Sequence, residues 1–563
     1  GNFHLKDIPV GNYYMTVHFI GYNKKVISNL EITPKQKHID LGTIELLLTA
    51  VELTAATITA DKMAVEYKLD RKVINVDQDL DAAGNSAVEI LEKAPSIRVD
   101  ISGDVYLRGS SNFTVLIDGK PSVLTGSEAL QQIPASTIEN IEIITNPSVK
   151  YDPDGTAGII NINTKKNKLD GLAGVINATA GTGDKYATDL SLNYKTGKFN
   201  ILGGVEWNDR QFPWTQTQQR QTNSGDTTRF KDSFGDGGWM RNGFKLRGSV
   251  DFNQDEKTSY SLGGEYGTFG FGMDNYMHIH EYIEPGSGNR YYINDDKRRW
   301  TRDYYSLNGS FRKSFDRKGQ NLTLYGQYNN RDGSEVQDKT EFDTVSDWNS
   351  IDQFPLLLRA VEAGPSQQVR FESDYTHPLG ASGKMETGYH FRWGKEDETA
   401  RTETWDYDRG EWLENEYYYK ESKYRRSIHA VYGIYSNSWK TLEYQLGLRG
   451  EYTYREVTVV NTDETSLVDR FDYFPSLHLS NRFNDKNQVM ASYSRRIERP
   501  RGYYLEPYET YLDEDTRRIG NPALLPEYTD SYEMGYLRTL EKGNVSADVY
   551  YRKTDNKITT IQT

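Results

Sequence analysis

The chain has 563 residues, a net charge of −14, 41 Tyr and no Cys. Without cysteine it cannot form a disulfide scaffold or a Cys-ligated zinc or iron–sulfur site. The negative charge argues against binding nucleic acid through its phosphates. No stretch reaches the roughly 18–20 apolar residues of a transmembrane helix, and the 12% aromatic content argues against disorder. A polar, aromatic-rich, β-dominated protein remains, and a transmembrane β-barrel fits because its strands are only half apolar.

Residues 1–48 predict short strands separated by turns. A segment of this size is too small for a stable core of its own, so we expect it to be the end of a larger β-sandwich. Because the chain starts at Gly1, we also expect that any secretory signal has been removed. Residues 49–70 predict a linker, in which 51–60 (VELTAATITA) lacks Gly and Pro and favours an extended conformation.

Residues 71–168 predict a mixed α/β block. Ser86 is a candidate N-cap for a helix over 87–94, and Ser127 is one for a helix over 128–132. Strands are predicted where β-branched and apolar residues cluster, at 105–107, 114–117 and 141–144.

Residues 171–563 alternate between apolar and polar side chains with period two. Within 441–455, the even positions include Leu442, Tyr444, Leu446 and Leu448, whereas the odd positions are mostly charged or polar. A strand of about 9–11 residues with one apolar face spans a bilayer when it is tilted. Short turns are predicted at 195–198, 253–256 and 484–486. Long polar stretches, which we predict as extracellular loops, lie at 209–242, 270–300, 332–366, 396–422 and 498–526.

A soluble β-sandwich or propeller is the alternative, because an antiparallel sheet with one wet face shows the same alternation. Two features favour the membrane barrel. Tyr residues lie at the ends of the apolar faces, as in an interfacial girdle. The five polar stretches also exceed the ~12–15 residues that are usual for soluble loops.

Five segments resemble, in order, the plug domain of TonB-dependent outer-membrane transporters. They are 95–99 (PSIRV), 105–109 (VYLRG), 115–121 (VLIDGKP), 133–143 (IPASTIENIEI) and 146–162 (NPSVKYDPDGTAGIINI). The YDPDG of 151–155, with Asn146 where many members have Gly, is similar to the Bacteroidota-type subfamily. Residues 1–48 resemble the end of a carboxypeptidase-regulatory-like sandwich, and 499–508 with 520–527 resemble a late-barrel signature of the same family.

This resemblance implies a mainly β fold. It consists of a transmembrane antiparallel β-barrel at 171–563, an internal α/β plug at 71–168 and a partial N-terminal β-sandwich at 1–48. Barrels of the family have 22 strands, whereas 171–563 supplies roughly 16 at about 25 residues per strand and connection. Since a barrel must close to hide its edges, we expect the last strands to be missing from this chain.

The resemblance also implies TonB-dependent import of a scarce nutrient (a siderophore, vitamin, peptide or oligosaccharide) across the outer membrane of a Gram-negative bacterium. TonB, driven by an ExbB/ExbD-type motor, would add as a strand to a periplasmic TonB box. The implied box is Val51, Glu52, Leu53, Thr54, Ala55, Ala56, Thr57 and Ile58. The other implied partners are the lipid bilayer with its lipopolysaccharide, and a surface lipoprotein or other outer-membrane subunits.

Two other functions stay open at this stage. A transporter-like barrel could serve as a non-transporting or accessory subunit of a larger outer-membrane complex. A passive porin is the other, and the plug motifs argue against it.

The apical plug loops are the expected substrate contacts: Arg108, Ser110, Ser111, Asn112, Phe113, Val123, Leu124 and Thr125. Arg108 has a second interpretation, an ion pair with a barrel carboxylate. His278 and His280 lie on one strand face, which suits zinc, copper or nickel, but without a third ligand we interpret this segment as a strand entering a loop. Residues 152–155 lack the spacing of a calcium loop. No catalytic set is evident, so we expect neither an enzyme nor a cofactor.

Overall fold

The computed structural model describes residues 9–17, 25–33, 39–45, 65–67, 71–76, 86–92, 94, 97–100, 104–111, 113–121, 126–131, 133, 135–155, 157–165, 171–286, 288–349, 353–380, 382–484, 486–500, 502–511, 517–540 and 543–561. The chain divides into two compact units, Gly1–Lys62 and Met63–Thr563. In the first unit, β1 (Gly11–Val17) pairs antiparallel with β2 (Lys25–Ile32).

The second unit contains a six-stranded mixed sheet with the order β3–β4–β9–β10–β7–β8. These strands are β3 (Val65–Tyr67), β4 (Lys72–Asn75), β9 (Ile138–Ile144), β10 (Gly158–Thr164), β7 (Phe113–Ile117) and β8 (Lys120–Pro121). β10 pairs antiparallel with β9 and parallel with β7. A separate pair joins β5 (Ile97–Val99) to β6 (Val105–Leu107), and a 3₁₀ turn spans Ala135–Thr137. Five isoleucines of β9 and β10 pack with Leu91 and Leu130 in one buried core: Ile138, Ile141, Ile143, Ile160 and Ile162.

The helix α1 (Ala87–Glu92) confirms the N-cap expected at Ser86. The Ser86 hydroxyl accepts a hydrogen bond from the Val88 amide (3.2 Å), and the Ser86 amide donates to the Glu89 carboxylate (2.7 Å). This reciprocal pair is a capping box. The prediction for Ser127 is wrong, because α2 (Gly126–Gln131) already contains it. Its hydroxyl accepts a hydrogen bond from the Val105 amide at 2.8 Å, so Ser127 fixes α2 to β6 instead of capping a helix.

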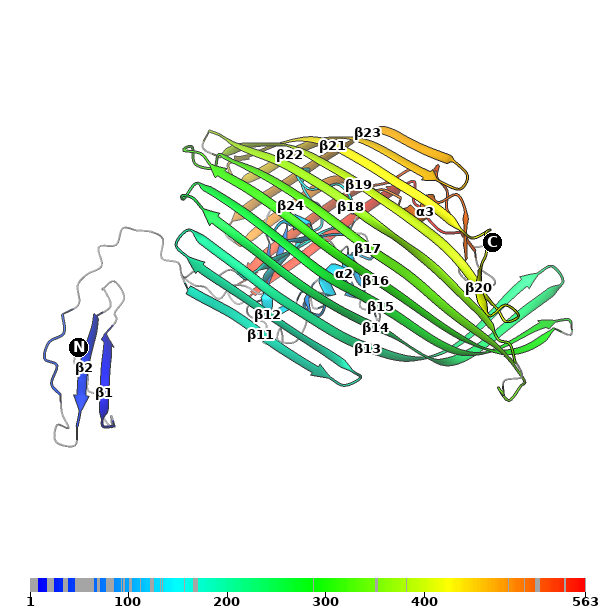
Figure 1. The fold of residues 1–563 in the computed structure, drawn as a ribbon. Coiled ribbons are helices and arrows are strands. Elements are labelled where there is room, and N and C mark those ends of the chain that lie inside the picture. The colour runs from blue at the N-terminus through cyan, green and yellow to red at the C-terminus, as the bar shows by residue number, and fades with distance from the viewer. Residues whose placement is uncertain are drawn as a thin grey trace. The chain divides into compact units, whose positions relative to one another are not determined.

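A 16-stranded antiparallel sheet forms the rest of the unit, as Figure 1 shows in its curved, tilted wall. Fifteen strands follow one another in chain order, from β11 at one end to β28 at the other, and β20 (Glu411–Glu414) pairs with β19 off this path. The path comprises β11 (Gly171–Gly181), β12 (Lys185–Thr196), β13 (Phe199–Ser224), β14 (Thr227–Asn253), β15 (Thr258–Glu284), β16 (Asn289–Ser314), β17 (Asn321–Thr344), β18 (Leu356–Leu379), β19 (Gly383–Asp406), β21 (Lys420–Trp439), β22 (Leu442–Val459), β23 (Glu464–Asn484), β24 (Asn487–Glu498), β27 (Glu527–Leu540) and β28 (Gly543–Asp555). The mainly β fold with an internal plug is therefore confirmed. None of the described helices is long and apolar enough to cross a membrane.

The two faces of this sheet have opposite environments. On β22, Leu448 is 54% exposed, whereas its neighbour Arg449 is fully buried at 0%. In a soluble sheet the apolar face would be the buried one. Here the charged face packs inward against the plug, and the apolar face lies outside, where lipid covers it.

Four of the five predicted extracellular loops are wrong as loops. They are long hairpins, because β13 to β19 run for 24 to 27 residues, about twice what the bilayer requires. Antiparallel pairing satisfies the backbone of a polar strand in water as well as in lipid, so the ladders continue past the membrane. Only 498–526 is mostly irregular, with α3 (Gly502–Leu505), β25 (Glu509–Tyr511) and β26 (Arg517–Ile519).

We expect Leu448→Arg to lower the free energy of unfolding by about 2–4 kcal/mol, because it places a charge on the lipid face near the middle of the membrane. Thr458→Arg is the matched control, since it lies on the same face of β22 near the turn to β23 and should cost only about 0–1 kcal/mol. Urea titrations of both variants in lipid vesicles measure this difference. Equal costs would contradict the assignment of the outer face to lipid.

Candidate functional site

Arg108 makes the first contact between the plug and the barrel wall. Backbone hydrogen bonds of 2.9 and 3.1 Å between Leu107 and Ser110 close the turn after β6, and Arg108 has a positive φ of 52°. Its guanidinium pairs with Glu533 of β27 (Nη2···Oε1 2.5 Å), and the side chain is only 1% exposed. It also lies 4.6 Å from the ring centre of Tyr550. Of the two roles expected for Arg108, the structure shows the ion pair with a barrel carboxylate.

Asn146, where many members of the family have Gly, adds a second set of contacts. Its side-chain amide donates to the Ser492 hydroxyl (2.7 Å) and to Glu533 (3.1 Å), and its carbonyl accepts from His478 Nε2 (2.7 Å). Ser494 donates to the side-chain oxygen at 3.3 Å. The Asn side chain, which a glycine would lack, therefore gives the plug three polar contacts with β24 and β27, and the contact with His478 of β23 is made by the backbone carbonyl.

The largest plug–barrel contact centres on Asp152 and Asp154, in the YDPDG segment. Asp152 forms ion pairs with Arg392 (2.9 Å), Arg370 (3.0 Å) and Arg449 (3.3 Å). Asp154 pairs with Arg392 and with Arg499, each at 2.6 Å. These arginines come from β18, β19, β22 and the residue after β24. We call the two aspartates and four arginines the Asp–Arg cluster.

Two barrel carboxylates balance the charge of the Asp–Arg cluster. Glu451, which is fully buried, pairs with Arg449 (2.8 Å) and Arg499 (2.5 Å), and Glu372 pairs with Arg370 (2.9 Å). The four arginines of the cluster thus face four carboxylates, and a fifth buried guanidinium, that of Arg496, donates to the backbone carbonyls of Asp154 (2.6 Å) and Gly155 (3.0 Å). Balanced charge matters because an unpaired buried charge costs several kcal/mol.

The electrostatics of the cluster favour the ionised aspartates. Burial by itself raises the pKa of Asp152, but Arg392, Arg370 and Arg449 together hold that pKa well below its ordinary value. Burial likewise opposes ionisation of Asp154, and Arg499 and Arg392 overcome it and lower the pKa. Both side chains therefore stay charged at neutral pH and remain anchored to the wall.

Glycine shapes the backbone that presents these aspartates. Gly158 has a φ of +128°, and a Cβ there would lie 2.5 Å from the Ile144 carbonyl oxygen. Gly155 has a φ of +89°, and a Cβ there would meet the Thr114 hydroxyl at 2.9 Å. Close approach to neighbouring strands explains why the segment carries glycine at both positions.

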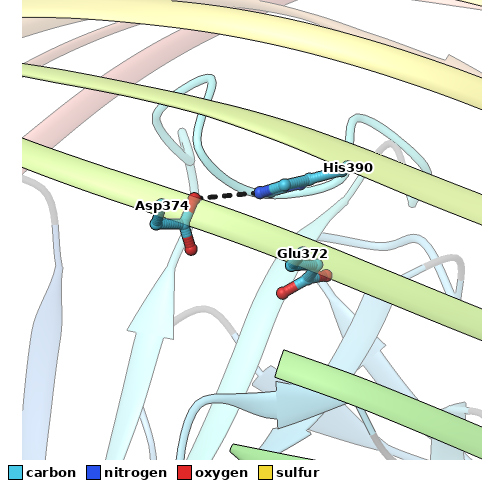
Figure 2. A group of neighbouring side chains, drawn as sticks. All are labelled: Glu372, Asp374 and His390. Carbon is cyan, nitrogen blue, oxygen red and sulfur yellow. Dashed lines mark hydrogen bonds and ion pairs between the residues drawn. The ribbon is translucent and has the colours of Figure 1, made fainter. Parts of the chain in front are cut away.

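A group of potential metal ligands, Glu372, Asp374 and His390, adjoins the Asp–Arg cluster (Figure 2). Their ligand atoms lie within 4.8 Å of one another. However, Arg449 contacts His390 Nδ1 (3.2 Å), and a guanidinium can only donate. His390 Nδ1 is therefore the acceptor, and Nε2 carries the proton that it donates to Asp374 (3.0 Å).

The remaining atoms of this group also have protein partners. Tyr432 donates to the same Asp374 oxygen, Lys150 lies 3.9 Å from the other one, and Arg370 pairs with Glu372. Each of the three residues is thus engaged by protein groups, and the side chains of Arg449, Arg370 and Lys150 contribute three cations next to them. These residues do not fit a metal ion and extend the plug–barrel contact instead.

His278 and His280 lie on one face of β15, as expected, but among aromatic rings. The His278 ring stacks on Phe234 (5.0 Å between ring centres), and that of His280 stacks on Tyr291 (4.1 Å). Asn289 bonds to His280 Nε2 at 2.6 Å. Within the described ranges, neither histidine belongs to a group with metal-ligand geometry.

The other predicted site residues separate into three groups. Phe113 is 5% exposed and packs in the plug core, which corrects its assignment as a substrate contact: it opens β7, whose inner face is apolar. Ser110 is half-buried and Ser111 is exposed. Asn112, Val123, Leu124 and Thr125, and the predicted TonB box from Val51 to Ile58, lie outside the described residues.

Sequence reasoning missed the barrel side of this interface. Arg449 and Glu451 stood on the charged face of the period-two strand, which was the available signal. That signal shows that they face inward, but it cannot identify Asp152 as a partner about 300 positions away.

Two family models match the chain. Residues 66–159 match the TonB-dependent receptor plug domain, and residues 313–563 match the outer membrane protein beta-barrel family. The chain combines a TonB-dependent receptor plug with an outer-membrane β-barrel. Its place is accordingly the Gram-negative outer membrane.

Solved structures show the same fold. The chain is similar to the unliganded ferric citrate transporter FecA (14% identity, TM-score 0.55, covering 89% of this chain and 72% of that one). It is also similar to the ferripyoverdine receptor of Pseudomonas aeruginosa (15% identity, TM-score 0.57, covering 95% of this chain and 72% of that one). A third similar structure is the copper transporter OprC (14% identity, TM-score 0.57, covering 87% of this chain and 72% of that one).

We expect the double variant Asp152→Asn with Asp154→Asn to destabilise plug docking by about 3–5 kcal/mol, because it leaves buried guanidinium groups unpaired. Single-channel recordings in planar bilayers should then show frequent openings that the unmodified protein lacks. Glu92→Gln, at the exposed end of α1, is the control and should stay closed. An equally closed double variant would contradict the anchoring role.

Plug docking should also resist mild acid. A lowered folded-state pKa stabilises the docked state above the ordinary aspartate pKa of about 3.9, and this stabilisation is lost only as the pH falls through the lowered values. Conductance should therefore be the same at pH 7 and at about pH 4. Opening of the pore between these two pH values would contradict the argument.

Proposed function

We propose that this protein imports a scarce nutrient across the outer membrane, with TonB supplying the energy. The observation that carries the proposal is the plug held in the lumen by the Asp–Arg cluster and by Arg108. A barrel of this size without a plug would be an open pore, whereas this one needs work to open. The outer membrane has neither ATP nor an ion gradient of its own, so the work must come from the periplasmic side.

The parts of the chain have distinct roles in this proposal. Residues 1–48 form a carboxypeptidase-regulatory-like module and 49–70 a linker with the TonB box at 51–58, both periplasmic. Residues 71–168 are the plug and 171–563 the barrel, of the Bacteroidota type, with its long hairpins outside the cell. TonB adds a strand to the box through backbone hydrogen bonds, and its pull breaks the ion pairs of the plug.

Substrate enters from the hairpin side in this proposal, and Ser110 and Ser111, one half-buried and the other exposed, are its contacts among the described residues of the predicted plug loops. The named activities of the similar structures, uptake of iron complexes and of copper, support a small scarce nutrient as the cargo. At 14–15% identity these likenesses carry the fold alone, so a siderophore, vitamin, peptide or oligosaccharide each fits.

Proline substitutions in the predicted TonB box test the proposal. Leu53→Pro and Ala55→Pro each remove a backbone donor that strand addition needs, and we expect energy-dependent uptake to fall at least about tenfold. Leu53→Ala is the matched control, because β-augmentation depends little on side chains. Uptake of labelled candidate nutrients by cells expressing each variant is the measurement.

Unchanged uptake in both proline variants, with normal surface expression, would overturn TonB coupling. It would favour the alternative of a non-transporting or accessory subunit, which co-purification of the barrel with other outer-membrane proteins would then identify.

A further inference from the structure

One edge of the Arg455 guanidinium is buried and makes no hydrogen bond to the described residues. Arg455 lies on the inner face of β22 and is 5% exposed. The two atoms of this edge are Nε and Nη2. Buried arginines are almost always paired, and each of the four in the Asp–Arg cluster has a carboxylate within 3.3 Å.

The neighbours of Arg455 increase the excess of positive charge. Arg426 of β21 lies directly opposite it in the β21–β22 ladder. Arg470 of β23 lies opposite Thr453, one diagonal step from Arg455. Tyr424 favours the charged form of Arg455, whereas the charges of Arg426 and Arg470 both oppose it. We call these three residues the arginine triad. Like charges directly opposite one another destabilise a sheet, so the arrangement has a cost in the empty protein.

Little on the barrel wall offsets that cost. Arg470 pairs with Asp472 (3.1 Å) and donates to the Tyr528 hydroxyl (2.6 Å). Arg426 is half-buried, with its guanidinium 5.9 Å from the ring of Tyr424. Among the described residues, Asp472 is the one carboxylate that forms an ion pair with the triad, and Asp154 of the plug acts on Arg426 from a longer distance. In the Asp–Arg cluster, by contrast, every arginine has a carboxylate ion pair.

The unpaired atoms have a specific geometry. Nε and Nη2 form one edge of the guanidinium plane, with two parallel N–H groups. That edge matches the two oxygens of a carboxylate or of a phosphate group. On β22 the triad lies six positions beyond Arg449, about 20 Å along the strand toward the long-hairpin side. It is thus on the side from which a ligand would enter.

We propose that the arginine triad binds an anionic group, a carboxylate or a phosphate, of the molecule that this barrel takes up. This assignment of an anionic cargo rests on the proposed import function, but binding itself needs no TonB. Arg455 accepts the anion along its free edge, and Arg426 and Arg470 flank it. The charge repulsion of the empty triad is relieved only when the anion is present.

The test uses the purified full chain in detergent and follows its thermal unfolding midpoint. The probes are inorganic phosphate and tricarballylate, a small tricarboxylate, with sodium chloride at matched ionic strength as the reference. We expect a saturable rise of the midpoint with at least one probe, and which probe acts distinguishes phosphate from carboxylate recognition. Arg455→Gln and Arg426→Gln should each raise the apparent dissociation constant at least about tenfold, since each removes a charge-assisted hydrogen-bond donor.

Arg425→Gln is the matched control. It is the neighbouring residue on β21, faces the outside of the barrel and lies opposite Glu456, so binding should not change. Without anion, Arg455→Met should raise the midpoint, because it removes an unpaired buried charge. A merely structural arginine would instead lower it.

Three results would overturn the proposal: no response beyond that to chloride, an equal response in Arg455→Gln, or an equal loss in Arg425→Gln. Uptake assays separate it from the import function. If anion binding depends on Arg455 but uptake does not depend on TonB, the anion site is supported and the import function is contradicted. If Arg455→Gln takes up the nutrient with unchanged apparent affinity, the anion site is contradicted and the import function is not.

Discussion

The hydrocarbon of a bilayer offers no hydrogen-bond partner to a peptide group, and this constraint sets the architecture of the barrel. Every strand of the wall must find its partners in neighbouring strands, which produces one continuous antiparallel ladder from β11 to β28. Because side chains alternate along a strand, an apolar outer face leaves the inner face for polar and charged residues. The lumen is then lined with charged groups, so the surface that fills it must carry hydrogen-bond partners and opposite charges for them. The plug surface carries such groups at Arg108, Asn146, Asp152 and Asp154.

The interface between plug and wall illustrates how buried charge is tolerated. Removing a carboxylate or guanidinium from water costs more than one surface-type ion pair returns. The Asp–Arg cluster offsets this cost because each charged group forms several ion pairs. Each aspartate contacts at least two guanidinium groups, and Glu451 links Arg449 to Arg499. Arginine suits this role because its planar fork serves several acceptors at once. Arg455 on the same wall differs from these arginines, because it is equally buried but its Nε and Nη2 atoms have no acceptor among the described residues.

Backbone geometry and charge act together at this interface. The turn at Arg108 adopts a positive φ that a non-glycine residue enters at some cost, and in this conformation Arg108 forms its ion pair with Glu533. Asn146 and the YDPDG segment reach the wall from the end of β9 and from the loop before β10. The plug is therefore attached at several points, on the β5–β6 pair and on the six-stranded sheet, and residues of both pack in one core, so a force on the plug acts on all of these points together.

The sequence by itself determined the features that depend on neighbours along the chain. Alternation over 441–455 fixed which side chains face lipid and which face the lumen, because successive residues of a strand point to opposite sides. Ser86 and Glu89 specified the start of α1, and ordered motifs identified the plug. Turn positions followed from local Gly, Asn and Asp residues. The extent of the hairpins did not follow, since a polar strand and a polar loop have similar compositions.

Only the tertiary structure decided which charges meet. Arg449 and Arg455 are both at odd positions of β22 and therefore lie on the same inner face. Arg449 pairs with Asp152 and Glu451, whereas Nε and Nη2 of Arg455 have no acceptor in the part of the chain that the structure describes. That difference depends on the register between strands and on where the plug rests in the lumen, and both involve residues hundreds of positions apart. Local sequence specifies to which face of the sheet a side chain points. Coulomb interactions depend instead on the distance between charges in space, and the packing of the plug against the wall sets these distances.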